Sequence, residues 1–89
     1  MKLPLNAAIL QQFLFHDELQ ADEIYQYLAP NYSAHRQYTL GTIEHSLQAA
    51  MFSGLLDESR LEERGGKVYT WYSPTEVGLS TIKRFVGEG

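Results

Sequence analysis

The sequence predicts one small domain that is mainly α-helical with a small β-hairpin. Apolar residues recur at spacings of three and four in several segments, which is typical of amphipathic helices. Gly65 and Gly66 stand between two segments rich in strand-forming residues, which indicates a hairpin. A chain of 89 residues can build one modest hydrophobic core but not two, so residues 1–89 are expected to form a single domain.

The first helix is expected over residues 7–16. Asn6 is the expected N-cap, because a short polar side chain can accept from the free N–H groups of a first turn. The apolar face of this helix is formed by Ile9, Leu10, Phe13 and Leu14. Its spacing predicts that one side of the helix packs on a core.

The second helix is expected over residues 21–28. Asp22 and Glu23 lie in its first turn, where the positive end of the helix dipole favours carboxylates. Pro30 and Asn31 are expected to end it, because proline cannot donate a backbone hydrogen bond. A polar and aromatic connector over residues 31–38 follows.

The third helix is expected to begin after Thr39, which can cap it, and to end at Gly54 in a left-handed conformation. Its inward stripe is formed by Leu40, Ile43, Leu47, Ala50 and Met51. Phe52 lies off this stripe, so it either packs under the connector or belongs to an oligomer contact. Leu55 and Leu56 are expected to return the chain to the core.

The hairpin is expected to pair residues 59–64 with residues 67–72 around the two glycines, which supply the positive φ angles of a two-residue turn. Alternation places Tyr69 and Trp71 on one face of the second strand and Tyr72 on the other. We expect Trp71 to be a core residue, because aromatic side chains of this size are largely buried.

A final short helix is expected after Pro74, with Thr75 as its N-cap. Its inward positions are Leu79, Ile82, Phe85 and Val86, and its C-terminal cations are Lys83 and Arg84. Residues 87–89 are expected to form a flexible tail.

Three helices, a hairpin and a short helix, in that order, predict a winged helix-turn-helix domain with a three-helix core, a wing and a short C-terminal helix. The chain resembles the PadR-like and MarR-like winged helix-turn-helix transcriptional regulators, most closely the PadR-like pattern. Gly-Thr-Ile at 41–43 and Gly-Leu-Leu at 54–56 match the start and exit of their recognition helix. Arg-Gly-Gly-Lys at 64–67 matches a basic wing, and Tyr-x-x-Thr-x-x-Gly at 72–78 matches the junction that follows it.

The sequence departs from this family pattern on the recognition helix and at the C-terminus. Glu44 and His45 stand where Tyr and Arg are common, and Gln48 and Ala49 replace a usual basic pair. Only about eleven residues follow Gly78 here, so we do not expect the long C-terminal dimerisation helix of the family within residues 1–89. The resemblance therefore corresponds to a short form of the family.

The resemblance implies sequence-specific binding of double-stranded DNA by a small transcriptional regulator. The third helix is expected to read the major groove, because short polar side chains and Gln can hydrogen-bond base edges. The expected DNA-binding residues are Thr39, Thr42, His45 and Gln48 on this helix, with Arg36, Arg64 and Lys67 on phosphates. One short domain makes few contacts, so a homodimer or a partner protein is expected to supply further affinity.

A second interpretation is a winged helix that serves as a protein–protein interaction module and does not touch DNA. The net charge of −4 and the absence of Lys and Arg between Thr39 and Gly54 favour it. The basic wing can likewise be an ordinary solvated hairpin, balanced by Asp57, Glu58, Glu62 and Glu63.

The sequence contains no motif that points to catalysis or metal binding. The chain has no cysteine, which excludes disulfides and thiol chemistry and is compatible with a cytoplasmic location. The three histidines have no metal-ligand spacing, and no nucleophile, phosphate-loop or paired-carboxylate motif is present. We therefore expect no metal, no cofactor, no membrane segment and no enzymatic activity.

Overall fold

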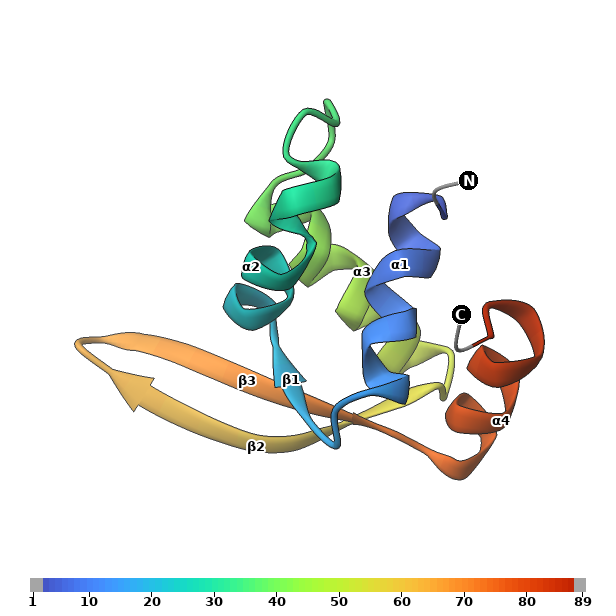
Figure 1. Cartoon of the computed structure of the whole chain (residues 1–89). Coiled ribbons are helices and arrows are strands. Elements are labelled where there is room, and N and C mark those ends of the chain that lie inside the picture. Colours follow the sequence, from blue (N-terminus) through green and yellow to red (C-terminus); the bar gives the residue numbers. More distant parts are fainter. Residues whose placement is uncertain (1–2, 88–89) are drawn as a thin grey trace.

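A three-stranded antiparallel sheet and four α-helices make up the computed structural model, which describes residues 3–87 (Figure 1). The elements are α1 (Leu5–Gln11), the 3-10 helix η1 (Gln12–Leu14), β1 (Leu19–Gln20), α2 (Ala21–Tyr32), α3 (Leu40–Phe52), β2 (Leu56–Arg64), β3 (Lys67–Pro74) and α4 (Glu76–Phe85). The architecture is thus mixed α/β, with more sheet than the expected small hairpin. It is compatible with a small winged-helix-like fold.

The predicted first helix starts and ends later than α1 does. The N-cap of α1 is Pro4, whose carbonyl accepts from the Ala8 N–H at 2.9 Å. The expected cap at Asn6 is therefore wrong. The helix begins earlier because Leu5 is buried and belongs to the core. After Gln11 the chain tightens into η1, which places Phe13 in the core.

A capping box starts α2. Gln20 accepts from the Asp22 N–H at 3.2 Å, and the Gln20 N–H donates to Glu23 at 3.0 Å. Both hydrogen bonds satisfy backbone donors that the first turn leaves free. Glu23 therefore has a capping role in addition to its favourable place near the helix dipole.

The expected end of the second helix at Pro30 and Asn31 is wrong, because α2 continues to Tyr32 with Pro30 inside it. Proline removes one backbone hydrogen bond of a helix and crowds the carbonyl four residues earlier, so this extension of α2 has a cost that other contacts must offset. The following turn still closes, since the Ser33 N–H donates to the Ala29 carbonyl at 3.1 Å. Tyr32 is buried, and its hydroxyl donates to the Leu3 carbonyl. Tertiary packing thus extends the helix.

Thr39 caps α3 as predicted, and its hydroxyl accepts from the Thr42 N–H at 3.0 Å. The buried face of the helix is formed by Ile43, Leu47 and Ala50. Gly54 has φ 82°, so the predicted left-handed end is confirmed. Phe52 is 82% exposed, which contradicts packing under the connector.

The sheet has the strand order β1-β3-β2, so β3 lies in the centre. The turn prediction is confirmed, because Gly65 and Gly66 have φ 58° and 83°. β1 was not expected from the sequence; its two residues pair Leu19 with Tyr72 and Gln20 with Trp71. This short strand ties the segment between η1 and α2 to the hairpin, which projects well beyond the helices (Figure 1).

One core joins the helices to the sheet. Its fully buried side chains come from α1, β1, α2, α3, β2 and α4 and include Ile9, Leu19, Ile24, Ile43, Leu47, Leu56 and Ile82. Tyr72 of β3 belongs to this core. Trp71 is 6% exposed and so is buried as expected, but it points to the opposite face of the sheet and lies outside the core cluster.

The start of α4 is joined to the turn that follows α3. Thr75 caps α4, and its hydroxyl also donates to the Gly54 carbonyl at 2.7 Å. The Thr75 N–H donates to the Leu55 carbonyl at 3.0 Å. Gly78 packs directly on the Leu55 backbone. The segments 54–56 and 72–78, which the sequence presents as separate motifs, therefore meet in one joint.

Thr75→Ala is expected to destabilise the domain by about 1–2 kcal/mol, because it removes both the cap of α4 and the hydroxyl that contacts Gly54. Urea unfolding followed by circular dichroism measures the loss. Thr75→Ser keeps the hydroxyl and is expected to retain most of the stability. Equal losses for both variants would contradict a role of the hydroxyl.

The inward face of α4 is only partly as predicted. Ile82 is buried, whereas Phe85 is 75% exposed, so its expected inward position is wrong. Val86, which follows the end of α4 at Phe85, packs against the core together with Ile82, so Phe85 is the predicted inward residue that departs to solvent in this last turn. Gly87 is held by a hydrogen bond from the Gln11 side chain at 3.2 Å. The remaining two residues of the expected flexible tail lie outside the described residues.

Candidate nucleic-acid interface

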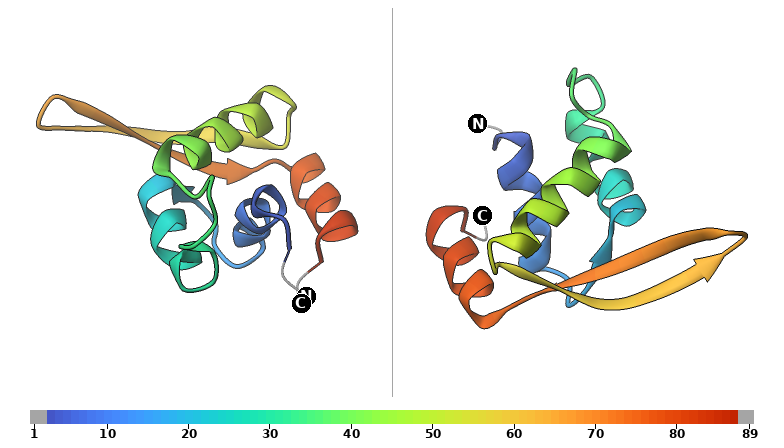
Figure 2. Two further views of the ribbon diagram at one scale, coloured as in Figure 1. Left: turned by 90° about the horizontal axis from the view of Figure 1, so that it is seen from above. Right: turned by 180° about the vertical axis from the view of Figure 1, so that it is seen from behind.

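The outward face of α3 carries the predicted base-reading residues. His45 and Gln48 are exposed, and Glu44 is exposed beside them. The view from behind shows α3 crossing the molecule with the hairpin projecting to one side (Figure 2). Glu44 and Gln48 line a cavity together with hairpin residues Lys67 to Thr70, so this part of the α3 surface adjoins the hairpin.

The two predicted threonines lie at the beginning of α3 and are engaged in its cap. The Thr39 hydroxyl donates to the Thr42 hydroxyl at 3.0 Å and accepts from the Thr42 N–H. Thr39 is exposed and Thr42 is half-buried. Their first task is to hold the start of the helix, and the Thr42 oxygen keeps a lone pair for an outside donor.

Arg36 lies in the connector between α2 and α3 and is exposed. Tyr38, at the end of the same connector, is buried, stacks on Tyr25 with ring centroids 4.5 Å apart, and donates to the Tyr25 carbonyl. Figure 1 places this connector at the opposite end of the molecule from the base of the hairpin. Arg36 is therefore separate from the cations of the hairpin.

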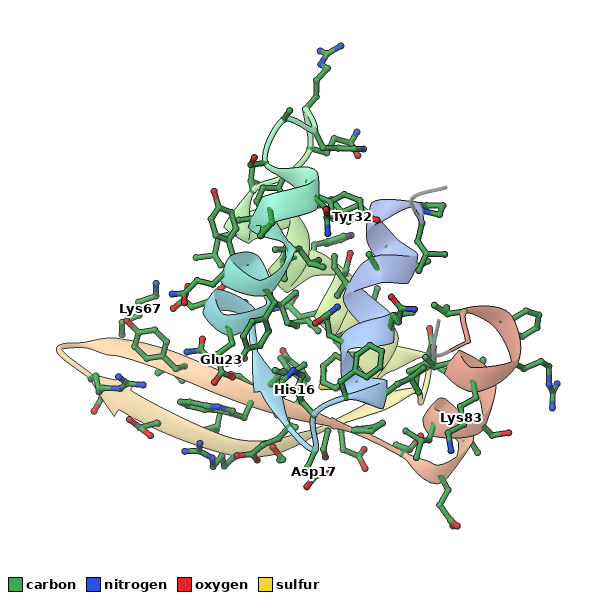
Figure 3. The ribbon with its side chains drawn as sticks, in the orientation of Figure 1. His16, Asp17, Glu23, Tyr32, Lys67 and Lys83 are labelled. Carbon is green, nitrogen blue, oxygen red and sulfur yellow. The ribbon has the colours of Figure 1, made fainter. Side chains whose placement is uncertain are left out.

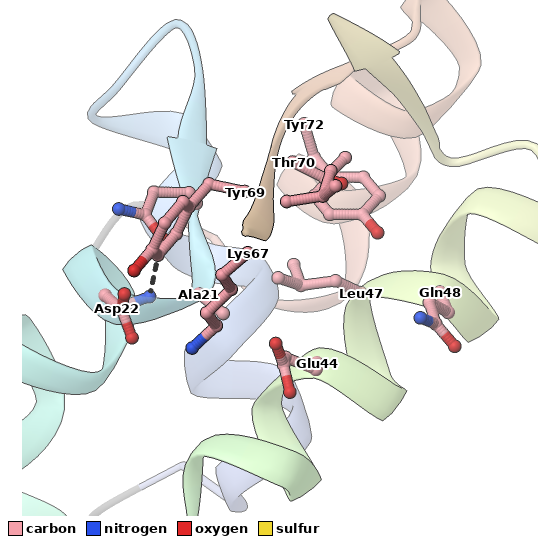
Figure 4. Close-up of a pocket in the computed structure, with 11 residues that line it drawn as sticks. Ala21, Asp22, Glu44, Leu47, Gln48, Lys67, Tyr69, Thr70 and Tyr72 are labelled. Atoms are coloured by element: carbon pink, nitrogen blue, oxygen red, sulfur yellow. Dashed lines mark hydrogen bonds between the residues drawn. The ribbon is translucent and has the colours of Figure 1, made fainter. Parts of the chain in front are cut away.

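A cavity of about 210 Å³ lies between the hairpin and α3 (Figure 4). Lys67 and Glu44 both extend into it, from β3 and α3 respectively, and Asp22 lines it from the first turn of α2. Leu47 and the ring of Tyr72 also line it. The predicted cation Lys67 thus shares this cavity with two carboxylates.

Burial raises the pKa of Tyr72, with smaller contributions from the negative charges of Glu58 and Glu44. At this edge of the core, Glu44 of α3 and Glu58 of β2 both act on one hydroxyl. The carboxylates that line the cavity itself come from α3 and α2, namely Glu44 and Asp22.

One face of the hairpin carries cations stacked on aromatic rings. We call it the outer face; it consists of Arg60, Glu62 and Arg64 of β2 and their partners Trp71, Tyr69 and Lys67 of β3. The Arg60 guanidinium lies 3.8 Å from the Trp71 ring centroid. The Arg64 guanidinium lies 4.8 Å from the Tyr69 ring centroid, and Lys67 Nζ lies 5.1 Å from it. Such contacts are stabilising by about 0.5–1 kcal/mol each where they are exposed.

Carboxylates also contact two of these cations. Glu62 forms an ion pair with Arg64, with Arg64 Nε 2.6 Å from one carboxylate oxygen, and its other oxygen accepts a hydrogen bond from Arg60 Nη1 at 3.2 Å. Glu18, which precedes β1, accepts from Arg60 Nε at 2.8 Å and from the Ser59 hydroxyl at 2.8 Å. The hydrogen bond from Arg60 and that from Ser59 lower the pKa of Glu18. Glu18 thereby ties the hairpin to the body of the domain.

A second cavity, of about 430 Å³, lies on the other side of the molecule between η1, the end of β3 and α4. Phe13, Phe15 and Leu79 line it together with Lys83. Figure 3 shows Lys83 on α4, far along the molecule from Lys67 near the tip of the hairpin. None of the predicted DNA-binding residues lines this second cavity.

The structure brings some predicted site residues together and not others. Gln48 and Lys67 line the same cavity, whereas Arg36 lies apart in its connector. The predicted site residues do not include three residues that form ion pairs at the outer face, namely Arg60, Glu62 and Glu18. The alternation of 60, 62 and 64 along one strand was the available signal for the first two. Nothing in the sequence marks Glu18 as a partner of the hairpin.

Other kinds of site find no support in the described part of the chain. No group of three or more His, Asp or Glu side chains in residues 3–87 is arranged to hold a metal ion. Within the same residues, no helix combines the length and apolar character needed to cross a membrane. Comparisons with protein-family models and with curated protein sequences found no match.

Proposed function

We propose that this chain is a winged helix-turn-helix domain that binds double-stranded DNA as a small transcriptional regulator. In this proposal α3 enters the major groove and the hairpin β2–β3, the wing, follows the phosphate backbone. The observation that carries it is the polar outward face of α3 beside a projecting hairpin with Arg64 and Lys67 at its tip. The element order and the resemblance to PadR-like and MarR-like regulators support the same assignment.

Each predicted side chain has a defined role in this proposal. His45 and Gln48 contact base edges, and Glu44 accepts from an exocyclic amino group such as that of cytosine. Arg36, Arg64 and Lys67 contact phosphates. Thr39 and Thr42 position the start of α3 and add one hydroxyl. A homodimer on a two-fold site would double the number of contacts.

Lys67→Ala is expected to weaken binding to a random duplex by about three- to tenfold and to lower the salt slope by about 1, because one phosphate contact is lost. Fluorescence anisotropy at low and moderate salt measures both quantities. Lys83→Ala is the matched control, since it removes the same charge from α4, away from the wing. It is expected to change affinity little.

Two results would refute the proposal. One is a folded wild-type protein with no detectable binding at low salt. The other is an equal loss of affinity for Lys67→Ala and Lys83→Ala, which would indicate attraction by overall charge alone.

A protein–protein interaction module is the second candidate function. Phe52 at the end of α3 is 82% exposed, and the wing arginines are engaged by carboxylates of the same chain. Large exposed aromatic side chains are typical anchors of protein interfaces. Absence of DNA binding in the titration above would favour this candidate.

A further inference from the structure

Glu62 holds a central position on the outer face of the wing. The residues that share this face are Arg60, Glu62 and Arg64 of β2 and Lys67, Tyr69 and Trp71 of β3, because the register pairs Arg60 with Trp71, Glu62 with Tyr69 and Arg64 with Lys67. The two carboxylate oxygens of Glu62 contact two different guanidinium groups, those of Arg60 and Arg64. One carboxylate thus occupies two of the cations on the face.

The contact between Glu62 and Arg64 is the closer one. Arg64 Nε lies 2.6 Å from one oxygen of Glu62, and the Arg64 guanidinium also stacks on Tyr69. No other carboxylate among residues 3–87 forms an ion pair with Arg64. Arg60 differs, because Glu18 contacts it independently at 2.8 Å. Loss of the Glu62 charge would therefore free Arg64, whereas Arg60 would keep a partner.

A carboxylate and a phosphate compete for the same donors. Guanidinium groups bind both anions through charge-assisted hydrogen bonds of similar geometry. Arg64 is 57% exposed and Glu62 is 40% exposed, so a backbone phosphate can approach the pair from solvent. Exposed ion pairs are weak enough to exchange with an outside anion. After Arg64 has exchanged Glu62 for a phosphate, the negative charge of Glu62 would still repel that phosphate.

We propose that Glu62 is an intramolecular competitor that occupies Arg64 and thereby lowers the affinity of the wing for a phosphodiester backbone. This inference rests on the proposed function, because it concerns the same contact with DNA. It makes the internal ion pair, and not only the number of cations, a determinant of affinity. A wing with Arg64 released would bind nucleic acid more tightly and with a steeper dependence on salt.

The test compares Glu62→Gln with Glu63→Gln in the full chain. Both variants remove one negative charge from adjacent positions of β2. Glu63 is the matched control, because it pairs with Val68 on the opposite face and forms no ion pair within residues 3–87. Fluorescence anisotropy with one random duplex at several salt concentrations measures affinity and salt slope. Thermal midpoints verify that both variants remain folded.

Glu62→Gln is expected to bind the duplex about three- to tenfold more tightly than Glu63→Gln, with a salt slope steeper by about 1. The gain is expected to disappear when Arg64→Ala is added, since it acts through that side chain. Equal gains for the two glutamine variants, or a gain that survives Arg64→Ala, would overturn the inference and leave DNA binding intact. Absence of binding by every variant would instead overturn the proposed function and, with it, this inference.

Discussion

Gly78→Ala is expected to destabilise the domain by about 3 kcal/mol or more and to lower its thermal midpoint by more than about 10 °C. A methyl group at this position would lie 2.6 Å from the Leu55 carbonyl carbon and closer still to its oxygen. Both atoms belong to backbone that hydrogen-bonds Thr75, so they cannot yield as a flexible side chain would. Relief of the clash requires α4 to separate from the turn after α3.

Gly41→Ala is the matched control for this prediction. Gly41 is exposed in α3, and a methyl group there would meet nothing nearer than the Thr39 hydroxyl at 3.9 Å. Alanine is favoured over glycine in helices by about 1 kcal/mol, so Gly41→Ala should be neutral or stabilising. Thermal and urea unfolding of both variants tests the pair. A Gly78→Ala protein as stable as the wild type would show that the joint between Leu55 and α4 is not tight.

Leu47→Ala is expected to cost about 2–5 kcal/mol of unfolding free energy, because it removes a fully buried side chain from the centre of α3. This loss is the sum of the lost transfer free energy of the side chain and the cost of the cavity left between α3 and the surrounding core. Urea unfolding measures it directly. The substitution leaves the charged residues of the wing unchanged, so the loss of stability reports on the core alone.

Gln48→Ala provides the comparison at the next position. Gln48 is exposed, so its replacement should change stability by less than about 0.5 kcal/mol. If the proposed function holds, this variant alters duplex binding instead. Similar destabilisation by both substitutions would contradict the assigned inward and outward faces of α3.

Local signals predicted the parts of the fold that depend on a few neighbouring residues. Thr39 and Thr75 cap their helices, and Gly54, Gly65 and Gly66 adopt positive φ angles. Each of these roles is fixed within about four residues, by one side-chain hydrogen bond or by the absence of a Cβ. Sequence therefore located the ends of α3 and the tip of the hairpin well.

Features that depend on distant residues were not predicted. β1 has only two residues and exists because Leu19 and Gln20 reach the edge of β3. α2 extends past Pro30 because Tyr32 finds a buried place and a carbonyl partner in Leu3. These outcomes come from tertiary packing, which periodicity within one segment does not encode.

The candidate site was predicted as a set of cations and polar residues, and their environment was not. Arg64 and Lys67 do lie on either side of the hairpin tip. Their carboxylate neighbours come from the same strand and from other elements, Glu62 next to Arg64 and Glu44 across the cavity from Lys67. A count of charges along the sequence could not distinguish a free arginine from a paired one.

The register of the hairpin shifts between Glu58 and Arg60, where Ser59 is an extra residue opposite the junction of Trp71 and Tyr72. A chain that lost Ser59 would still match Glu58 with Tyr72 and Arg60 with Trp71. Loss of a single residue further along β2 would turn each later side chain to the other face. Related sequences of unequal length are therefore expected to gain or lose one residue at this position, and pairs of residues toward the tip.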